Sequence, residues 1–150
     1  MVGSFITATL FTAAVTLGVG LYSAQYQAVR SERAAQVDKF IQSSEALDPL
    51  VQRFVADERA GHLTAKTRSA IRDNLLKQRS ALDAVRSVAP ASDKRAINQY
   101  EDTLERTDAG IKSADGLLTS HEFVQEVVHL TEQRDPLFKT LKAPPSLLMN

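Results

Sequence analysis

The chain has 150 residues, of which 43% are hydrophobic and 24% are charged, a composition typical of one folded domain. Its 18 basic and 18 acidic side chains balance, so it lacks the positive field that attracts nucleic acid, and we expect no nucleic-acid partner. It has no cysteine, which excludes disulfides, zinc-thiolate sites and thiol nucleophiles.

The N-terminal segment is free of charge. From Val2 to Tyr22 there are 21 uncharged residues, and the first charged side chain is Arg30. At about 1.5 Å per residue this stretch spans roughly 31 Å as a helix, close to the hydrocarbon thickness of a bilayer. Tyr22 and Tyr26 follow where an interfacial aromatic belt lies. We expect residues 1–29 to form a single transmembrane anchor with membrane lipid as a partner.

A cleaved secretory signal is the alternative for this segment. Such a signal has basic residues before its apolar stretch and small residues at the cleavage site. No basic residue precedes Val2, and cleavage after Ala24 or Ala28 would place a bulky tyrosine at the upstream recognition position. An uncleaved anchor is therefore the favoured interpretation.

Small side chains recur every fourth residue along the anchor. Such a ridge lets two helices approach closely in lipid, where packing and interhelical hydrogen bonds cause association. We predict a packing face for a membrane-protein partner or for a second copy of the chain, although an anchor rich in Ala and Thr with no partner is the alternative. The proposed face consists of Ser4, Ala8, Thr12, Thr16, Gly20 and Ala24.

Beyond the anchor the apolar residues keep a helical period, and the punctuation residues divide residues 30–142 into four segments. We expect Asp48-Pro49 either to kink the first segment or to restart it with Asp48 as the cap, and Gly61 to end it. Pro90 ends the second, and a capping box from Thr119 to Glu122 opens the fourth. The expected helices are 30–60, 64–89, 92–118 (capped by Ser92) and 120–142, followed by a tail over 143–150.

Short connections join these segments, which predicts an all-α fold in which the transmembrane helix continues into an up-down antiparallel four-helix bundle. A three-helix array on a long stalk is the alternative. It would require residues 30–61 to stand free, and the apolar face formed by residues such as Val37, Phe40 and Phe54 argues against that.

Four polar residues interrupt the apolar seams at similar distances from the far end of the bundle: Ser44, Gln78, Thr107 and Arg134. A polar layer in a bundle either fixes the register of the helices or holds a small ligand. Fixing register is the favoured interpretation, with a ligand site as the alternative. Arg134 has a further option, because its long side chain can reach outward to a surface carboxylate.

Catalytic and metal-binding patterns are absent from the sequence. Glu126 and His129 have the Glu-x-x-His spacing of a di-iron bundle, but the second such pair is missing. Phosphate loops, nucleophile elbows and metalloprotease motifs do not occur. We therefore expect no cofactor, no metal and no enzymatic activity.

The orientation in the membrane has two opposing indications. Arg30, Arg33 and Lys39 follow the span and no basic side chain precedes it, which by the positive-inside rule places the bundle in the cytoplasm. A helical domain after a short N-terminal anchor is nevertheless the common design of bacterial sensor and envelope proteins. We expect an inner- or plasma-membrane protein with its bundle outside the cytoplasm.

Three functions fit this layout. A structural or accessory subunit of a membrane assembly is favoured by the small-residue ridge and the absence of catalytic motifs. A ligand-sensing module acting through a partner is the second, because the domain resembles the four-helix domains of bacterial chemoreceptors in general shape. The third is an envelope protein similar to phage spanins in its anchor-plus-helix layout, although proline breaks and short turns favour a folded bundle over a rod.

Overall fold

The computed structural model of the chain describes residues 25, 27–114 and 117–143. The chain divides into two compact units, Met1–Ala34 and Ala35–Asn150. In the first unit the described residues, 25 and 27–34, are helical and mostly exposed. The predicted anchor and its packing face, Ser4 to Ala24, lie outside the described residues.

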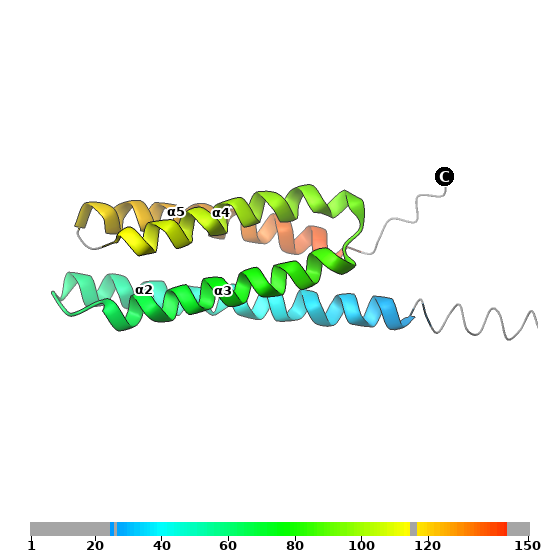
Figure 1. Ribbon diagram of the computed structural model, residues 1–150, viewed down its shortest axis with the longest axis horizontal. Helices are drawn as coiled ribbons and strands as arrows, with labels where there is room; N and C mark the ends of the chain where they lie inside the picture. Colours follow the sequence, from blue (N-terminus) through cyan, green and yellow to red (C-terminus); the bar gives the residue numbers. More distant parts are fainter. Residues whose placement is uncertain (1–24, 26, 115–116, 144–150) are drawn as a thin grey trace, which may run out of the picture. The chain divides into compact units, whose positions relative to one another are not determined.

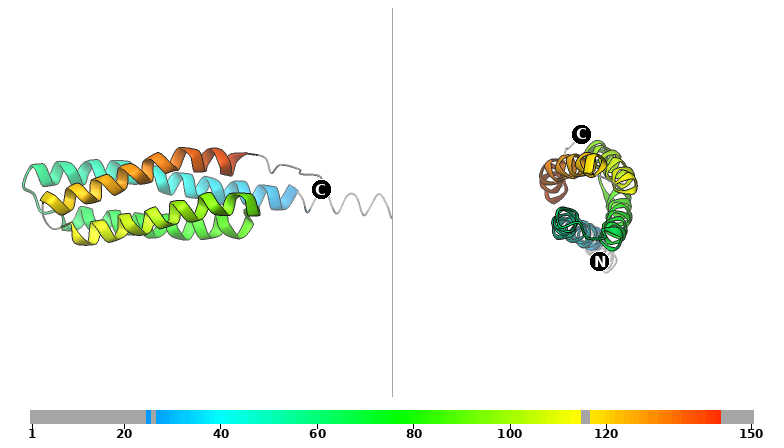
Figure 2. Two further views of the ribbon diagram at one scale, coloured as in Figure 1. Left: turned by 90° about the horizontal axis from the view of Figure 1, so that it is seen from above. Right: turned by 90° about the vertical axis from the view of Figure 1, so that its left-hand side faces the viewer.

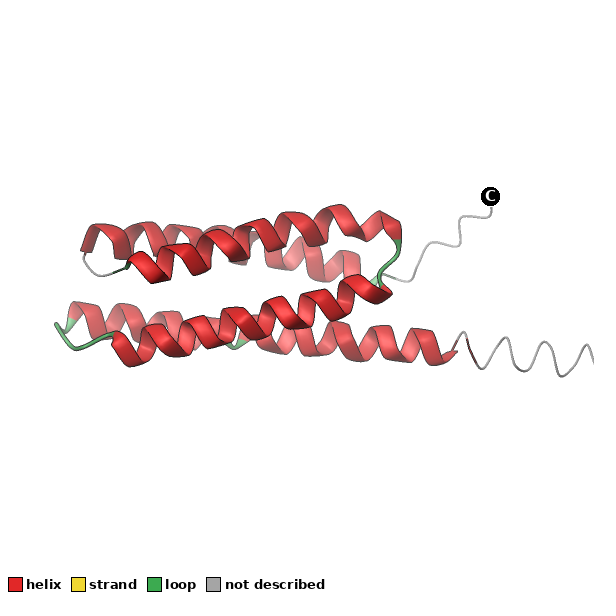
Figure 3. Cartoon of the chain, in the orientation of Figure 1, coloured by secondary structure: helices red, strands yellow, loops and turns green. Residues whose placement is uncertain are grey.

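The second unit is helical throughout its described part. Residues 35–45 are helical, and they are followed by α2 (Leu47–Arg59), α3 (Ala65–Val88), the short 3-10 helix η1 (Ala91–Asp93), α4 (Lys94–Ser113) and α5 (Leu117–Lys142). Figures 1 and 3 show these helices packed along one another, with no strand in the described ranges. The expectation of an all-helical bundle is confirmed.

The helices α2, α3, α4 and α5 run in alternating directions. Each packs against the next in the chain, and α3 therefore lies between α2 and α4, while α4 lies beside α5 (Figure 2). Side chains close the bundle between α2 and α5. Phe54 packs edge-on against Phe123 at a ring-centroid distance of 5.4 Å, and Asp48 meets Arg134 further along the same two helices. The residue numbers rise on α2 as they fall on α5, as they must in an antiparallel pair.

Large apolar side chains fill the centre. Phe40, Phe54, Ile71 and Phe123 are completely buried, and they belong to a cluster with residues from positions 35–45 and from each of α2, α3, α4 and α5. Phe40 makes edge-on contacts with Tyr100 and Phe138, which ties residues 35–45 to α4 and α5. The helical period of the sequence therefore identified the buried faces correctly.

Helix α2 ends in a left-handed glycine turn. Gly61 has φ of +68°, its N–H donates to the carbonyl of Glu58, and the N–H of His62 donates to the carbonyl of Asp57. This pair of bonds is the Schellman motif, which satisfies carbonyls that the helix end leaves without partners. The sequence prediction that Gly61 ends this helix is confirmed.

The break in the first segment occurs earlier than expected. A single turn residue, Ala46, separates the two helical stretches, and Asp48 lies inside the first turn of α2 and is not its N-cap. Pro49 is the third residue of α2, where a missing N–H removes no intrahelical bond that the first turn would otherwise make. The expectation that Asp48 caps the helix was wrong, because α2 already begins at Leu47 and its N-cap position is Ala46.

Both ends of α4 and the start of α5 also differ from the sequence prediction. Ser92 lies in η1 and donates to Oδ1 of Asp93, while α4 begins only at Lys94. Helix α4 ends at Ser113 and not at residue 118, and α5 begins at Leu117, so Thr119 is inside α5 and cannot open it. Leu118 continues the heptad spacing of the third predicted helix, and for this reason the sequence pattern extends that helix into residues that belong to α5.

We asked whether any helix of the described residues could span a membrane. None of them combines the length and the apolar composition that crossing a bilayer requires. Residues 2–22, where the sequence predicts the span, lie outside the part of the chain in which this was assessed.

Candidate functional site

Three of the four polar residues predicted in the core are deeply buried. Ser44 is 2% exposed, and Gln78 and Thr107 are 0% exposed. They belong to residues 35–45, α3 and α4 respectively. Burying such groups is unfavourable unless they are hydrogen-bonded, so their partners determine what this part of the core can do.

Tyr100 of α4 joins two of them. Its hydroxyl donates to Oε1 of Gln78 at 2.9 Å and lies 3.1 Å from Oγ of Ser44. A phenol has one proton, and Tyr100 gives it to Gln78, so Ser44 is the donor in the second bond. One hydroxyl thus connects residues 35–45, α3 and α4 at the centre of the bundle.

The chain of hydrogen bonds returns to where it began. Nε2 of Gln78 donates to Oδ1 of Asn74 at 2.7 Å, and Nδ2 of Asn74 donates to the main-chain carbonyl of Ser43 at 2.9 Å. Ser43 precedes Ser44, so the bonds form a closed circuit that begins and ends on the last turn before the break at Ala46. We refer to the side chains of Ser44, Asn74, Gln78 and Tyr100 with the Ser43 carbonyl as the polar ring.

The polar ring carries no charge. Burial raises the pKa of Tyr100 to about 12, and the hydrogen bond from Ser44 and the positive charge of Arg134 only partly oppose this. The phenol therefore stays protonated near neutral pH, and it is neither a nucleophile nor a proton acceptor there. Each polar atom of the ring already has a partner, so the ring fits a register-fixing role better than a ligand site.

Thr107 is not part of the polar ring. It lies seven residues beyond Tyr100 on α4, which is two helical turns or about 10 Å along the axis. Its hydroxyl donates to the carbonyl of Thr103 at 2.8 Å, a bond within its own helix. A buried threonine that is satisfied in this way needs no ligand.

Arg134 makes no hydrogen bond to the polar ring. It pairs with a carboxylate, which is the alternative that its long side chain allowed. Its Nη1 lies 3.0 Å from both carboxylate oxygens of Asp48, which joins α5 to α2. The Arg134 side chain is 15% exposed and that of Asp48 is 41% exposed. The pair is therefore partly screened from water and stronger than a fully exposed one.

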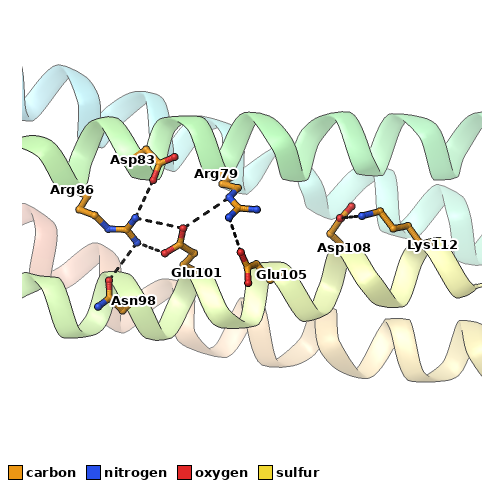
Figure 4. Close-up of polar contacts among 8 residues, drawn as sticks. All are labelled: Arg79, Asp83, Arg86, Asn98, Glu101, Glu105, Asp108 and Lys112. Atoms are coloured by element: carbon orange, nitrogen blue, oxygen red, sulfur yellow. Dashed lines mark hydrogen bonds and ion pairs between the residues drawn. The ribbon is translucent and has the colours of Figure 1, made fainter.

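A row of ion pairs connects α3 to α4. Arg72, Arg79 and Arg86 recur every seventh residue on α3 and face Asp108, Glu105 and Glu101 of α4. Nη2 of Arg79 lies 2.6 Å from Oε1 of Glu105, and Figure 4 shows this pair beside the contacts of Arg86 with Asp83, Asn98 and Glu101. We refer to the three arginines and three carboxylates as the α3–α4 ladder.

The described residues line surface hollows at two places that we compared with ligand pockets. A hollow of about 190 Å³ adjoins the ladder, where Leu76 is exposed beside Arg79 and Glu105. A shallower one of about 490 Å³ lies on the last turns of α5 beside Phe138 and Lys142. The first is smaller than a typical ligand pocket and the second is open to solvent.

Metal-ligating side chains do not gather within the described residues. No group of three or more histidine and carboxylate side chains is close enough to hold an ion. Glu126 pairs with Arg106 at 3.3 Å, and Nδ1 of His129 lies 3.5 Å from Glu132. The Glu-x-x-His spacing on α5 thus belongs to surface ion pairs.

Sequence reasoning missed two members of the polar ring. Tyr100 occupies a position on the apolar seam of α4, and a buried tyrosine usually finds a partner for its hydroxyl. Asn74 lies four residues before Gln78, so both project from one face of α3. An amide pair at this spacing on an apolar seam was the available signal.

Comparison with known proteins leaves the family open. We found no significant match between this chain and a protein-family model, a curated protein or a solved structure.

Proposed function

We propose that the chain is a non-enzymatic, single-pass membrane protein whose N-terminal anchor carries the helical bundle as a structural or accessory subunit of a membrane assembly. The observation that supports this most directly is the 21-residue uncharged stretch from Val2 to Tyr22 beside a compact helical unit. Its length matches a bilayer, and the charged residues begin only at Arg30.

The polar groups of the bundle support a role without chemistry. The buried polar ring is neutral, and its hydroxyls and amides bind one another. Arginines of the α3–α4 ladder are paired with carboxylates and are not aimed at a common point. Active sites instead bring perturbed ionisable groups together in a pocket.

Membrane anchoring is tested by fractionation of the full chain with a C-terminal tag. We expect the tagged protein to stay in the membrane pellet after alkaline extraction. In a separate detergent partitioning experiment, we expect it in the detergent phase. A matched pair of variants places arginine either within the stretch, Leu10→Arg with Leu17→Arg, or on the exposed bundle surface, Leu76→Arg. Release by the first pair alone supports the anchor, and retention of both sets in the pellet would contradict it.

The partner and the orientation need separate experiments. Copurification from native membranes followed by mass spectrometry should find a stoichiometric membrane protein or a second copy of the chain. Replacing Thr12, Thr16 and Gly20 by leucine should abolish that association if the small-residue ridge is the contact.

C-terminal fusions to alkaline phosphatase and to a fluorescent protein distinguish an extracytoplasmic bundle, which we favour, from the cytoplasmic one that the positive-inside count predicts.

A ligand-sensing module is the second candidate function, because a polar layer lies in the bundle core. A ligand there would have to replace hydrogen bonds that Tyr100 and Gln78 already make with each other and with their neighbours. Thermal-shift screening of the purified protein with small metabolites tests this, and a raised melting temperature that Tyr100→Phe abolishes would favour sensing.

A spanin-like envelope role is the third candidate, and it predicts lysis defects in cells that lack the protein.

A further inference from the structure

Two helices of the bundle carry a backbone interruption. Ala46 separates residues 35–45 from α2 with ψ of −10°, well away from the value of about −42° in a regular helix, and Pro49 follows in the first turn of α2. Pro136 lies inside α5. In a helix that continued through Ala46, the N–H of residue 49 would bind the carbonyl of Glu45, and in α5 the N–H of residue 136 would bind that of Glu132. Neither proline has this N–H.

Both interruptions lie at one level of the bundle. Asp48 precedes Pro49, Arg134 lies two residues before Pro136, and these two charged side chains bind each other directly. Phe40, in residues 35–45 before the break, is in ring contact with Phe138 of α5 one to two turns away. The missing backbone bonds therefore oppose each other across the α2–α5 seam within about one helical turn.

The other two helices are continuous at this level. Neither α3 nor α4 contains a proline or a turn residue between its ends. The α3–α4 ladder extends over two heptads of α3, from Arg72 to Arg86, and connects the two helices along that length. Figure 4 shows its contacts at Arg79 and Arg86. Bending resistance is thus unequal, with a braced hairpin on one side and two interrupted helices on the other.

We propose that this level is a hinge, at which the half of the bundle containing α2 and the first turns of α5 bends relative to the α3–α4 hairpin. The Asp48–Arg134 pair is its latch, because it bridges the two interrupted helices beside both prolines. The polar ring holds the near side of the hinge, since it fixes the last turn before Ala46 to α3 and α4. This inference goes beyond the proposed function and does not depend on membrane anchoring.

Such a hinge would let the bundle bend when one of its ends is displaced. A displacement applied through residues 35–45 or through the C-terminal turns of α5 would reach the interrupted level first. Breaking one partly buried ion pair then frees the seam, while the apolar core and the ladder persist on either side. Conformational changes commonly occur at places where helices carry a few weakened backbone positions.

Hydrogen exchange of the full-length protein in detergent tests the latch. We expect Asp48→Asn and Arg134→Gln each to raise exchange about tenfold in residues 43–50 and 132–140, with α3 and α4 unchanged. Arg79→Gln is the matched control, because it removes an ion pair from the ladder, away from the α2–α5 seam. An increase of equal size in all helices would overturn the proposal, and so would no increase in the two named segments.

Removing a proline tests the hinge in a variant that keeps the latch. Pro136→Ala supplies the missing donor to Glu132, so we expect exchange in residues 133–140 to slow by about tenfold or more. Pro90→Ala, in the turn between α3 and α4, is the control and should leave that segment unchanged. Unchanged or faster exchange in Pro136→Ala would show that α5 is not weakened at this level and would overturn the proposal.

Discussion

The hydroxyl of Tyr100 donates to Oε1 of Gln78 across 2.9 Å, and neither side chain is more than 1% exposed. This bond joins α4 to α3 where the bundle is otherwise filled by apolar side chains. Because Ser44 donates to the same hydroxyl, shifting any one helix by a turn would leave several buried groups without partners. The polar ring therefore specifies how the three helices align.

Tyr100→Phe should destabilise the protein by about 2–4 kcal/mol, since the phenylalanine keeps the packing against Phe40 but leaves Ser44 and Gln78 without their partner. Urea unfolding followed by circular dichroism measures this. Ser87→Ala on the exposed face of α3 is the control and should change stability by less than about 0.5 kcal/mol. A Tyr100→Phe protein as stable as the wild type would show that the ring bonds contribute nothing.

A double substitution separates loss of partners from loss of volume. Gln78→Leu with Tyr100→Phe removes the acceptor and the donor of one bond, while either single change leaves one of them unpaired. We therefore expect the double variant to be destabilised by at least about 1 kcal/mol less than the sum of the two single variants, even though Asn74 and Ser44 each lose a partner as well. The same urea experiment gives the coupling free energy. Additive destabilisation in the double variant would mean that the two side chains act independently.

Stability should fall in alkaline solution because of Tyr100. Its folded-state pKa is about 12 and the ordinary value is 10.0, so the unfolded chain releases this proton first as the pH rises. The stabilisation is complete below pH 10, declines between pH 10 and 12, and amounts to about 2–3 kcal/mol in total. The difference between unfolding free energies of the wild type and Tyr100→Phe should shrink over this range. A constant difference would contradict the assignment, and the phenolate absorbance of the two proteins provides the titration.

Periodicity was enough to predict the helices and most of the buried face. Phe40, Ile71, Leu104 and Phe123 lie where a period of 3.6 residues places them, because one face of each helix must pack. The sequence also placed Ser44 and Gln78 in the core. The apolar pattern carries this information whatever the partners are.

Hydrogen-bond partners and helix ends were harder to predict. Tyr100 and Ser44 are 56 residues apart, and only the packing of three helices brings their hydroxyls together. Arg134 has a stem long enough to reach either the core or a carboxylate, and Asp48 on another helix decides between them. The break at Ala46 contains no glycine or proline. In a continuous helix the ring of Pro49, three residues downstream, would clash with the carbonyl of Glu45 just before the break.

The α3–α4 ladder should contribute little at any single position. Arg79 is 49% exposed, so Arg79→Gln should cost less than about 1 kcal/mol in dilute buffer, even though it faces both Glu101 and Glu105. The difference should largely disappear in about 1 M salt, where exposed charges are screened. Comparing urea midpoints of both proteins at low and high salt tests this. A cost that persists in high salt would indicate that Arg79 acts through packing of its stem and not through charge.

Two glycines should respond to alanine in opposite directions. Gly61→Ala should destabilise the protein by about 1 kcal/mol, because φ of +68° is unfavourable for any residue with a Cβ although nothing lies within 4 Å. Gly110 is helical, and a Cβ there would lie 3.4 Å from Cα of Phe123, an ordinary contact at the edge of the close range. Gly110→Ala should therefore stabilise α4 by about 0.5–1 kcal/mol, whereas Gly110→Val, with two further methyl groups directed at α5, should be destabilising. Thermal unfolding of the three variants tests the two geometries together. If Gly110→Ala were as destabilising as Gly110→Val, the approach of α4 to α5 would have to be closer than the structure places it.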